Sequence, residues 1–341
     1  MVSSVKTVRV ATTLLLIGAL AACSTEAAPA PKPTPVYTST LAAPEATGLA
    51  PLTGEVVPLG SLATSSLAAK IDNHLAARPQ VGLERSDIVF EELVEGGLTR
   101  YVAVWQSDVP DEIGPVRSIR PMDPDIVSAF GGIIAYSGGQ QRFVALMQKT
   151  NVYNAIHGQA STADTFYRTK TKKSPHNVLV LASTIVGQHP EIPAPQQQFA
   201  FAADAASATA TKDGAPTSLV NLRFSNATAP SWTWDATNGN YLRAQLGVAD
   251  MDSNGAQLTA ANVIALRVGV TVSQNVPKTE LIGSGEAWIS SGGSTIHATW
   301  SKDAATSAIR LVDDQGVTVR LAPGNSWIEL IPTAGSVELV P

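Results

Sequence analysis

The sequence has one cysteine, Cys23, among its 341 residues, so an intramolecular disulfide is excluded. It contains no HExxH, paired CxxC, Walker or GxSxG motif, and its five histidines are scattered without metal-ligand spacing. Charged residues make up 15% of the chain and the formal net charge is −5, so no basic field recruits nucleic acid. We therefore expect no metal, no cofactor and no nucleic-acid partner.

The N-terminus has the pattern of a bacterial lipoprotein signal. Lys6 and Arg9 precede an apolar run, residues 10–22, that is too short for a comfortable membrane span and ends in "LAAC" at Cys23. We predict a signal peptide over 1–22, cleavage before the cysteine and acylation of its thiol, for example with palmitate. The predicted location is the extracytoplasmic face of the cell membrane. A plain secretory signal with a coincidental cysteine is the alternative.

A proline-rich stretch follows the signal. Residues 24–51 contain six prolines among alanine, threonine and serine. Such a composition cannot bury enough apolar surface to fold. We predict that residues 23–51 form a disordered tether, with the lipidated cysteine at its start.

Two domains are predicted beyond the tether. Residues 52–195 alternate strand-like runs with short helix-like runs, which favours an α/β sandwich. After the Pro/Gln-rich residues 189–198, short β-like runs alternate with Gly-rich turns, so residues 196–341 are predicted to be mostly β. The expected fold class is thus α+β, an N-terminal α/β sandwich followed by a β-rich domain. The tryptophans of the second domain suit either its core or a sugar-binding groove.

The first domain contains a predicted β-hairpin. Strand-like runs at 88–95 and 98–105 are separated by Gly-Gly, which favours a two-residue turn. That turn would place Arg100 on one face, diagonally between Glu91 and Glu95. We predict these three residues to form structural ion pairs. Because both faces of the hairpin are largely apolar, we expect an inner strand pair covered on both sides.

Glu92 would lie on the opposite face without a cation from its own hairpin. A buried, unpaired carboxylate is costly and either finds a partner or stays protonated. Arg117 and Arg120, in the stretch "EIGPVRSIRPMDPD", are the nearest candidates. A structural ion pair and a ligand-gripping or catalytic Glu–Arg cluster both remain open. The carboxylates of this region could hold a hard cation, but the nearby arginines would repel it.

Further polar residues extend this cluster. "KIDNHLAARP" supplies an aspartate, an asparagine and an arginine, and the basic run "TFYRTKTKKSPHNVLV" ends beside a His-Asn pair. Planar guanidinium groups favour a bidentate grip on phosphate or carboxylate, and histidine titrates near neutrality. The candidate ligand-binding residues are Asp72, Asn73, Arg78, Arg117, Arg120, Arg168 and Asn177. The candidate catalytic residues are Glu92 and His176.

Several long stretches carry a family resemblance. In the first half they are "PLTGE", "KIDNHLAARPQVGLERSDIVFEELVEGGLTRYVAVWQSDVPDEIGPVRSIRP" and "KSPHN", and in the second "WTWDATNGNYLR", "LTAANVIAL", "GSGEAW", "ATWSKD" and "LAPGNSWIELIP". These resemble the YerB-type bacterial lipoproteins, which have a two-part domain of unknown function (DUF3048). The resemblance covers nearly everything after residue 50. It implies a lipid-anchored envelope protein with an α/β domain before a β-rich one, and it implies no activity or cofactor.

Three functions remain open from the sequence. The first is a lipoprotein that binds an anionic cell-wall or lipid-linked ligand through the Arg/Glu cluster. The second is an envelope phosphodiester or glycosidic hydrolase or transferase that uses the same cluster. The third is a scaffold for other envelope proteins, in which the arginines are purely structural.

Overall fold

The computed structural model describes residue 32 and residues 44–341. The predicted signal peptide, Cys23 and most of the predicted tether lie outside these residues. Within the range predicted as a tether, Thr47–Leu49 forms strand β1, which pairs with β2 (Val56–Pro58), and Ala50 is buried. Among the described residues, every helix is too short or too polar to cross a membrane.

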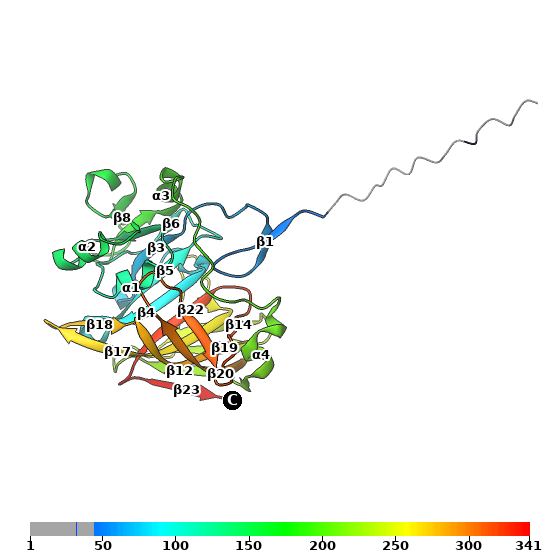
Figure 1. Cartoon of the computed structure of the whole chain (residues 1–341). Helices are drawn as coiled ribbons and strands as arrows, with labels where there is room; N and C mark the ends of the chain where they lie inside the picture. The colour runs from blue at the N-terminus through cyan, green and yellow to red at the C-terminus, as the bar shows by residue number, and fades with distance from the viewer. Residues whose placement is uncertain (1–31, 33–43) are drawn as a thin grey trace, which may run out of the picture. The chain divides into compact units, whose positions relative to one another are not determined.

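The first half of the folded unit contains three short helices among its strands (Figure 1). After β1 and β2, its strands are β3 (Leu67–Asp72), β4 (Ile88–Leu93), β5 (Thr99–Trp105), β6 (Glu112–Ile113), β7 (Ile133–Tyr136), β8 (Tyr153–Ile156), β9 (Phe166–Arg168) and β10 (Val178–Leu181). Its helices are α1 (Asp123–Val127), α2 (Gln141–Met147) and α3 (Ala182–Gln188).

The regular structure of the second half consists mostly of strands. It contains α4 (Thr209–Asp213), β11 (Ala215–Pro216), β12 (Leu219–Arg223), β13 (Pro230–Asp235), β14 (Asn240–Gln245), β15 (Val248–Ala249), β16 (Thr259–Ala260), β17 (Asn262–Ser273), β18 (Val276–Glu280), β19 (Gly283–Ser291), β20 (Ser294–Lys302), β21 (Arg310–Asp313), β22 (Ser326–Pro332) and β23 (Ser336–Val340). The protein is therefore mostly β. The more specific expectation, that residues 52–195 form an α/β sandwich, stays a prediction.

One twelve-stranded sheet runs through both halves. Its main path is β11-β20-β19-β17-β22-β4-β5-β3-β7-β8, with β18 and β21 attached to β17 and β20. Strand β22 is parallel to both of its neighbours, β17 and β4, so it joins the two halves. Residues 45–341 accordingly form one compact unit. The domain boundary near residue 195, which the sequence suggests, stays a prediction.

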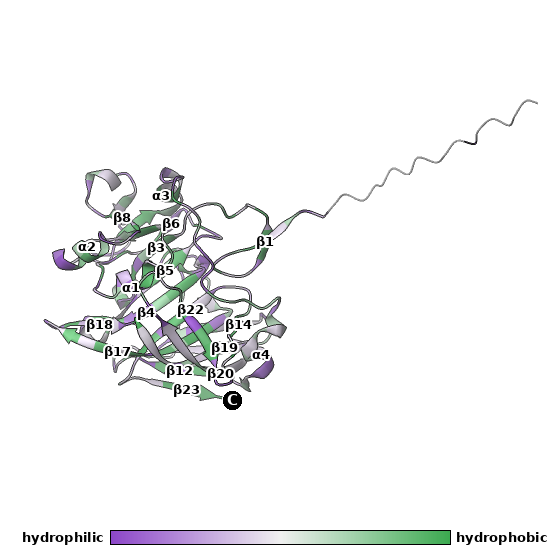
Figure 2. Ribbon diagram, viewed as in Figure 1, coloured by the Kyte–Doolittle hydropathy of each residue, from purple (hydrophilic) through white to green (hydrophobic). Residues whose placement is uncertain are grey.

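The central strands of this sheet are covered on both faces. On one face, Phe90 and Val102 belong to a core that includes side chains of α1 and α2. On the other face, Val89 and Tyr101 belong to a core shared with the six-stranded sheet β15-β14-β13-β12-β23, to which β16 also pairs. Apolar residues accordingly dominate the central strands β3 and β5 in Figure 2. The prediction that β4 and β5 are covered on both sides is confirmed.

The predicted register of the β4–β5 hairpin is wrong by one residue. Glu92 lies opposite Arg100, and β4 ends at Leu93 because the loop is longer than Gly-Gly. Residues 95–97 form a 3₁₀ turn in which both glycines have positive φ. Because side chains alternate between faces, the shift places Glu92, rather than Glu91, on the face of Arg100.

Arg243 joins the two large sheets in the second core. Its fully buried guanidinium on β14 pairs with Asp250 and reaches across to Glu91 on β4. It also lies 4.9 Å from the ring centroid of Trp327, on β22. Beside it, Glu329 is register-paired with Glu91 and accepts a hydrogen bond from Trp232 Nε1 at 2.8 Å. The core tryptophans Trp232, Trp300 and Trp327 are all buried, so they do not line a sugar-binding groove.

Replacing Glu329 with glutamine is expected to stabilise the protein at neutral pH. Burial, and then the nearby charge of Glu91, raise the pKa of Glu329 well above its ordinary value. Folded protein thus keeps a proton that the unfolded chain releases above about pH 4.3, so stability falls as the pH rises towards the folded pKa. Glutamine stays neutral at every pH, and urea denaturation at pH 7 should show a gain on the order of 1–3 kcal/mol.

The matched control is Glu286→Gln, because Glu286 is a largely exposed carboxylate on β19. It should leave the dependence of unfolding free energy on pH unchanged. If Glu329→Gln also leaves that dependence unchanged between pH 4 and 8, Glu329 is not protonated in the folded state.

Candidate functional site

The segment that carries the two arginines of "GPVRSIRP" runs beside β3. Asp72 N donates to Pro115 O at 2.9 Å and Arg117 N donates to Lys70 O at 2.8 Å. These bonds continue the edge of β3 beyond the point where β7 stops pairing at Ala69. The extended segment therefore places Arg117 directly beside Asp72, at the carboxyl end of a central strand.

A cavity of about 220 Å³ opens at this end of β3. We call it the arginine pocket. Its lining residues are Asp72, His74, Val94, Glu95, Leu98, Thr99, Arg100, Arg117, Arg120 and His176. Four of the predicted ligand-binding and catalytic residues thus come together, from segments far apart in the sequence.

Two carboxylates of the pocket hold its basic side chains. Asp72 Oδ2 lies 3.1 Å from Arg117 Nε and 2.6 Å from His176 Nδ1. Glu95 Oε2 accepts from Arg120 Nε at 2.9 Å, and Arg120 Nη1 donates to backbone carbonyls of its own turn. Arg120 is therefore well satisfied, whereas the Nη groups of Arg117 make no hydrogen bond with any residue that the structure describes.

Arg100 adds a third guanidinium. Arg100 is only 8% exposed, and the one hydrogen bond that its guanidinium makes within residues 44–341 runs from Nη1 to Ser118 O at 2.6 Å. No described carboxylate lies within ion-pairing distance of it. Burial, followed by the charges of Arg120 and Arg117, lowers the pKa of Arg100 to about 10. Three guanidinium groups therefore face two carboxylates, which leaves an excess of positive charge.

His176 occupies the side of the pocket next to Asp72. Its ring stacks on His74 with the centroids 4.4 Å apart. Since a carboxylate only accepts hydrogen bonds, Nδ1 of His176 donates to Asp72 and Nε2 is left for a ligand. Nδ1 of His74 accepts from Ala76 N at 3.0 Å, so that nitrogen carries no proton.

Four predicted ligand-binding residues lie outside the lining. Asn73 is buried and accepts a hydrogen bond at Oδ1 from Arg78 Nε at 3.0 Å. Arg168 donates to Asn177 Oδ1 at 2.8 Å and thereby stabilises the turn between β9 and β10. These side chains support the walls around the pocket, and none of them lines it.

The predicted catalytic role of Glu92 does not fit its position. Glu92 is fully buried beneath the pocket and pairs with Lys70, on β3, which also bonds Asp123 Oδ1 at 2.8 Å. A carboxylate without access to the cavity cannot exchange a proton with a ligand there. Glu92 does have a cation, although not from its hairpin, and its place in the structure is that of a buried ion pair.

The predicted ion pairs of the hairpin also have different partners. Arg100 pairs with neither Glu91 nor Glu95, because the register shift turns Glu91 to the opposite face. Glu91 instead binds Arg243, and Glu95 binds Arg120. The sequence interpretation missed Lys70, although a lone lysine within the apolar strand "SLAAKID" indicates a buried partner.

Fold and site together define a mostly β protein with an arginine-lined cavity at the end of its central sheet. The N-terminal domain of the family described as "Protein of unknown function (DUF3048)" matches residues 52–191. The C-terminal domain of the same family matches residues 220–328. The chain belongs to this family, which confirms the resemblance found in its sequence.

A curated relative and a solved structure agree with this assignment. The protein named "Putative lipoprotein YerB" from Bacillus subtilis is 25% identical over 293 residues, which are 83% of this chain and 86% of the relative. The crystal structure of YerB protein from Bacillus subtilis superposes with a TM-score of 0.74 at 24% identity, covering 85% of this chain and 99% of that one. The second comparison shows that the two proteins have the same fold.

Proposed function

We propose that this protein is a membrane-anchored cell-envelope lipoprotein that binds an anionic ligand in the arginine pocket. The signal pattern ending at Cys23 and the name of the Bacillus relative support the lipid anchor and an extracytoplasmic location. A phosphate- or carboxylate-bearing glycan, or a lipid-linked precursor, has the chemistry that such a pocket recognises.

The observation that carries this proposal is Arg100. An arginine that is largely buried normally has a carboxylate partner, because an unpaired buried charge is costly. Arg100 has none among the described residues, and it lines a cavity together with the free Nη groups of Arg117. An anion bound there would supply the missing partner. A purely structural arrangement, as the scaffold hypothesis requires, would pair every arginine internally.

Replacing Arg100 or Arg117 with glutamine is expected to weaken anion binding at least about tenfold. Each change removes charge-assisted hydrogen bonds that contribute roughly 1.5–3 kcal/mol. Isothermal titration calorimetry with inorganic phosphate and with glucuronate measures the effect, and added salt should weaken wild-type binding.

Arg85→Gln is the matched control, since Arg85 forms an exposed ion pair with Asp108 away from the pocket. Its binding constants should equal those of the wild type. If folded Arg100→Gln protein binds phosphate and glucuronate as tightly as the wild type does, the pocket is not the anion site. The same conclusion follows if the wild type binds neither anion.

A second candidate function is hydrolysis or transfer at the same pocket. It is favoured by the contact between Asp72 and His176, which fixes Nδ1 and leaves Nε2 of the imidazole available as a general acid or base. Turnover of bis(4-nitrophenyl) phosphate by the wild type would assign catalysis to the pocket if His176→Gln abolished it and still bound phosphate.

A further inference from the structure

A second hollow, of about 530 Å³, lies beside the arginine pocket. We call it the apolar groove, because Leu75, Pro79, Leu246, Val248 and Met251 form most of its wall. Leu75, Leu246 and Val248 are exposed to 79%, 61% and 70%. Single exposed apolar residues are ordinary, but several that line one hollow mark a binding surface. The volume is in the range of small-molecule sites.

Leu246 is held in an unfavourable backbone conformation. It forms, with Gly247, the two-residue turn between β14 and β15, and the φ angles of the two residues are 51° and 77°. Turns with positive φ at both positions favour Asn-Gly or Gly-Gly, and a leucine there is strained. The turn itself therefore has no need of a leucine. An exposed apolar side chain kept at this cost indicates a role for the side chain.

The two hollows share one wall. His74 lines the arginine pocket, and the next residue, Leu75, lines the apolar groove. Asn73 connects the walls from below, because it accepts from Arg78 Nε at 3.0 Å on the groove side and donates to Thr99 Oγ1 at 2.8 Å on the pocket side. One buried side chain is thus bonded to a residue of each wall.

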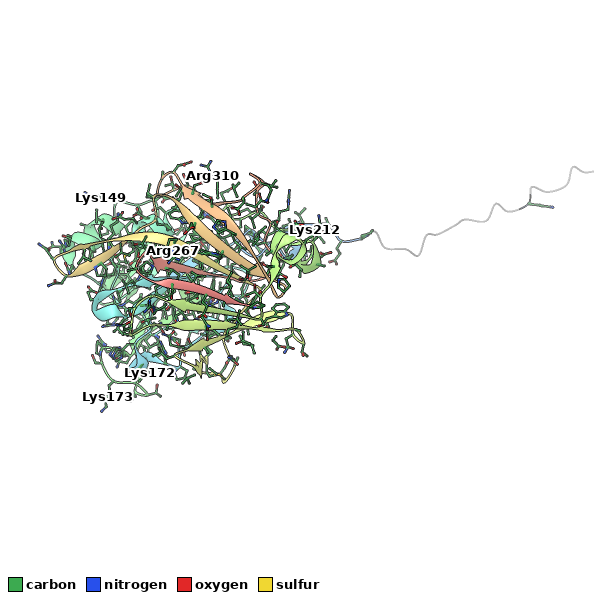
Figure 3. The ribbon with its side chains drawn as sticks, turned by 90° about the horizontal axis from the view of Figure 1, so that it is seen from below. Lys149, Lys172, Lys173, Lys212, Arg267 and Arg310 are labelled. Atoms are coloured by element: carbon green, nitrogen blue, oxygen red, sulfur yellow. The ribbon has the colours of Figure 1, made fainter. Side chains whose placement is uncertain are left out.

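The loop that leads to His176 runs along the same rim. Lys172 Nζ donates to Pro79 O at 2.9 Å, and Pro79 is part of the groove wall. Lys172 and Lys173 lie together at one edge of the molecule (Figure 3). Positive charge therefore borders the groove as well as the pocket.

We propose that the ligand is an anionic amphiphile. Its phosphate or carboxylate head would occupy the arginine pocket, and its apolar chain would lie along the apolar groove over the His74–Leu75 rim. This inference rests on the proposed anion binding and adds the class of ligand. A fully soluble glycan or free phosphate would leave the apolar wall without a partner, whereas an amphiphile covers both surfaces.

Three probes separate the contributions of head and chain: butyl phosphate, decyl phosphate and decyl maltoside, each below its micelle concentration. Calorimetry with the full-length protein should show decyl phosphate binding about tenfold or more tighter than butyl phosphate, since each buried methylene adds up to about fourfold in affinity. Decyl maltoside, which lacks the charge, should bind much more weakly than decyl phosphate.

Leu246→Asn and Val248→Thr test the groove itself. Asn-Gly suits this turn, so Leu246→Asn should unfold at the same temperature as the wild type or a higher one. Both variants should lose severalfold in affinity for decyl phosphate and keep their affinity for butyl phosphate. Val272→Thr is the matched control, because Val272 is 67% exposed on β17 and does not line the groove, and it should change neither.

Each outcome decides between the two proposals. Equal wild-type affinities for butyl and decyl phosphate would overturn the amphiphile and leave anion binding in place. Binding of neither phosphate would overturn both. If decyl maltoside binds as tightly as decyl phosphate, the arginine pocket contributes nothing to binding. Sedimentation with phosphatidic acid vesicles, without binding of monomeric decyl phosphate, would show a membrane-docking surface and overturn the proposal.

Discussion

Replacing Arg243 with methionine is expected to destabilise the protein by about 3–5 kcal/mol, which is a large part of the roughly 5–15 kcal/mol that stabilises a typical domain. The variant leaves two buried carboxylates, Glu91 and Asp250, without their shared cation. It also removes the charge over the rings of Tyr101, Trp232 and Trp327. Urea denaturation followed by tryptophan fluorescence measures the loss.

Arg310→Met is the control for this change. Arg310 is mostly exposed, pairs with Asp303 at the surface and lies on the outside of the molecule (Figure 3). Surface pairs of this kind contribute little, so its denaturation midpoint should stay close to that of the wild type. The triple variant Arg243→Met, Glu91→Gln, Asp250→Asn should recover part of the loss. A single variant as stable as the wild type would mean that the buried carboxylates are protonated.

Replacing Lys70 with methionine is expected to cost a similar amount, about 3–5 kcal/mol. Lys70 is completely buried and is the common partner of Glu92 and Asp123, although burial already lowers its own pKa to about 8. The other oxygen of Asp123 accepts a hydrogen bond from Arg120 N at 2.6 Å. Loss of Lys70 should therefore loosen the turn that presents the arginines and weaken phosphate binding as well as the fold, as calorimetry and urea denaturation can measure.

Lys149→Met provides the comparison, because Lys149 is exposed after α2 (Figure 3). It should change neither the unfolding free energy nor the affinity for phosphate. The double variant Lys70→Met, Glu92→Gln should be more stable than Lys70→Met alone, since one unpaired charge is removed. If the double variant is less stable than Lys70→Met, Glu92 has a second partner that stabilises its charge more than Lys70 does.

The convergence of Asp72, Arg117, Arg120 and His176 could be anticipated from local sequence. The sequence indicates Arg117 and Arg120 as the nearest cations to a hairpin with an unpaired glutamate, and it places Asp72 and His176 in polar stretches that adjoin strands. The family resemblance pointed to the same stretches. The chemistry of the residues then suggested a cationic pocket, because a proline-rich turn has no folding requirement for two guanidinium groups.

The partners of the buried charges could not be anticipated in this way. Arg243 and Glu91 are far apart in the chain and meet only because two sheets pack face to face. The hairpin register depended on a 3₁₀ turn at Glu95 that a Gly-Gly pair does not reveal. The shared sheet depended on β22 pairing with β4, and neither strand carries a local signal for the other.

The position of β22 also has a consequence for biosynthesis. In a chain made from its N-terminus, residues 326–332 follow residues 88–93 by more than 200 residues, so β4 must wait with a bare row of amide and carbonyl groups until β22 is made. Parallel pairing between such distant segments is slow to form. This unfinished edge is exposed to aggregation in the meantime, and a fragment limited to residues 52–191 would leave it permanently open.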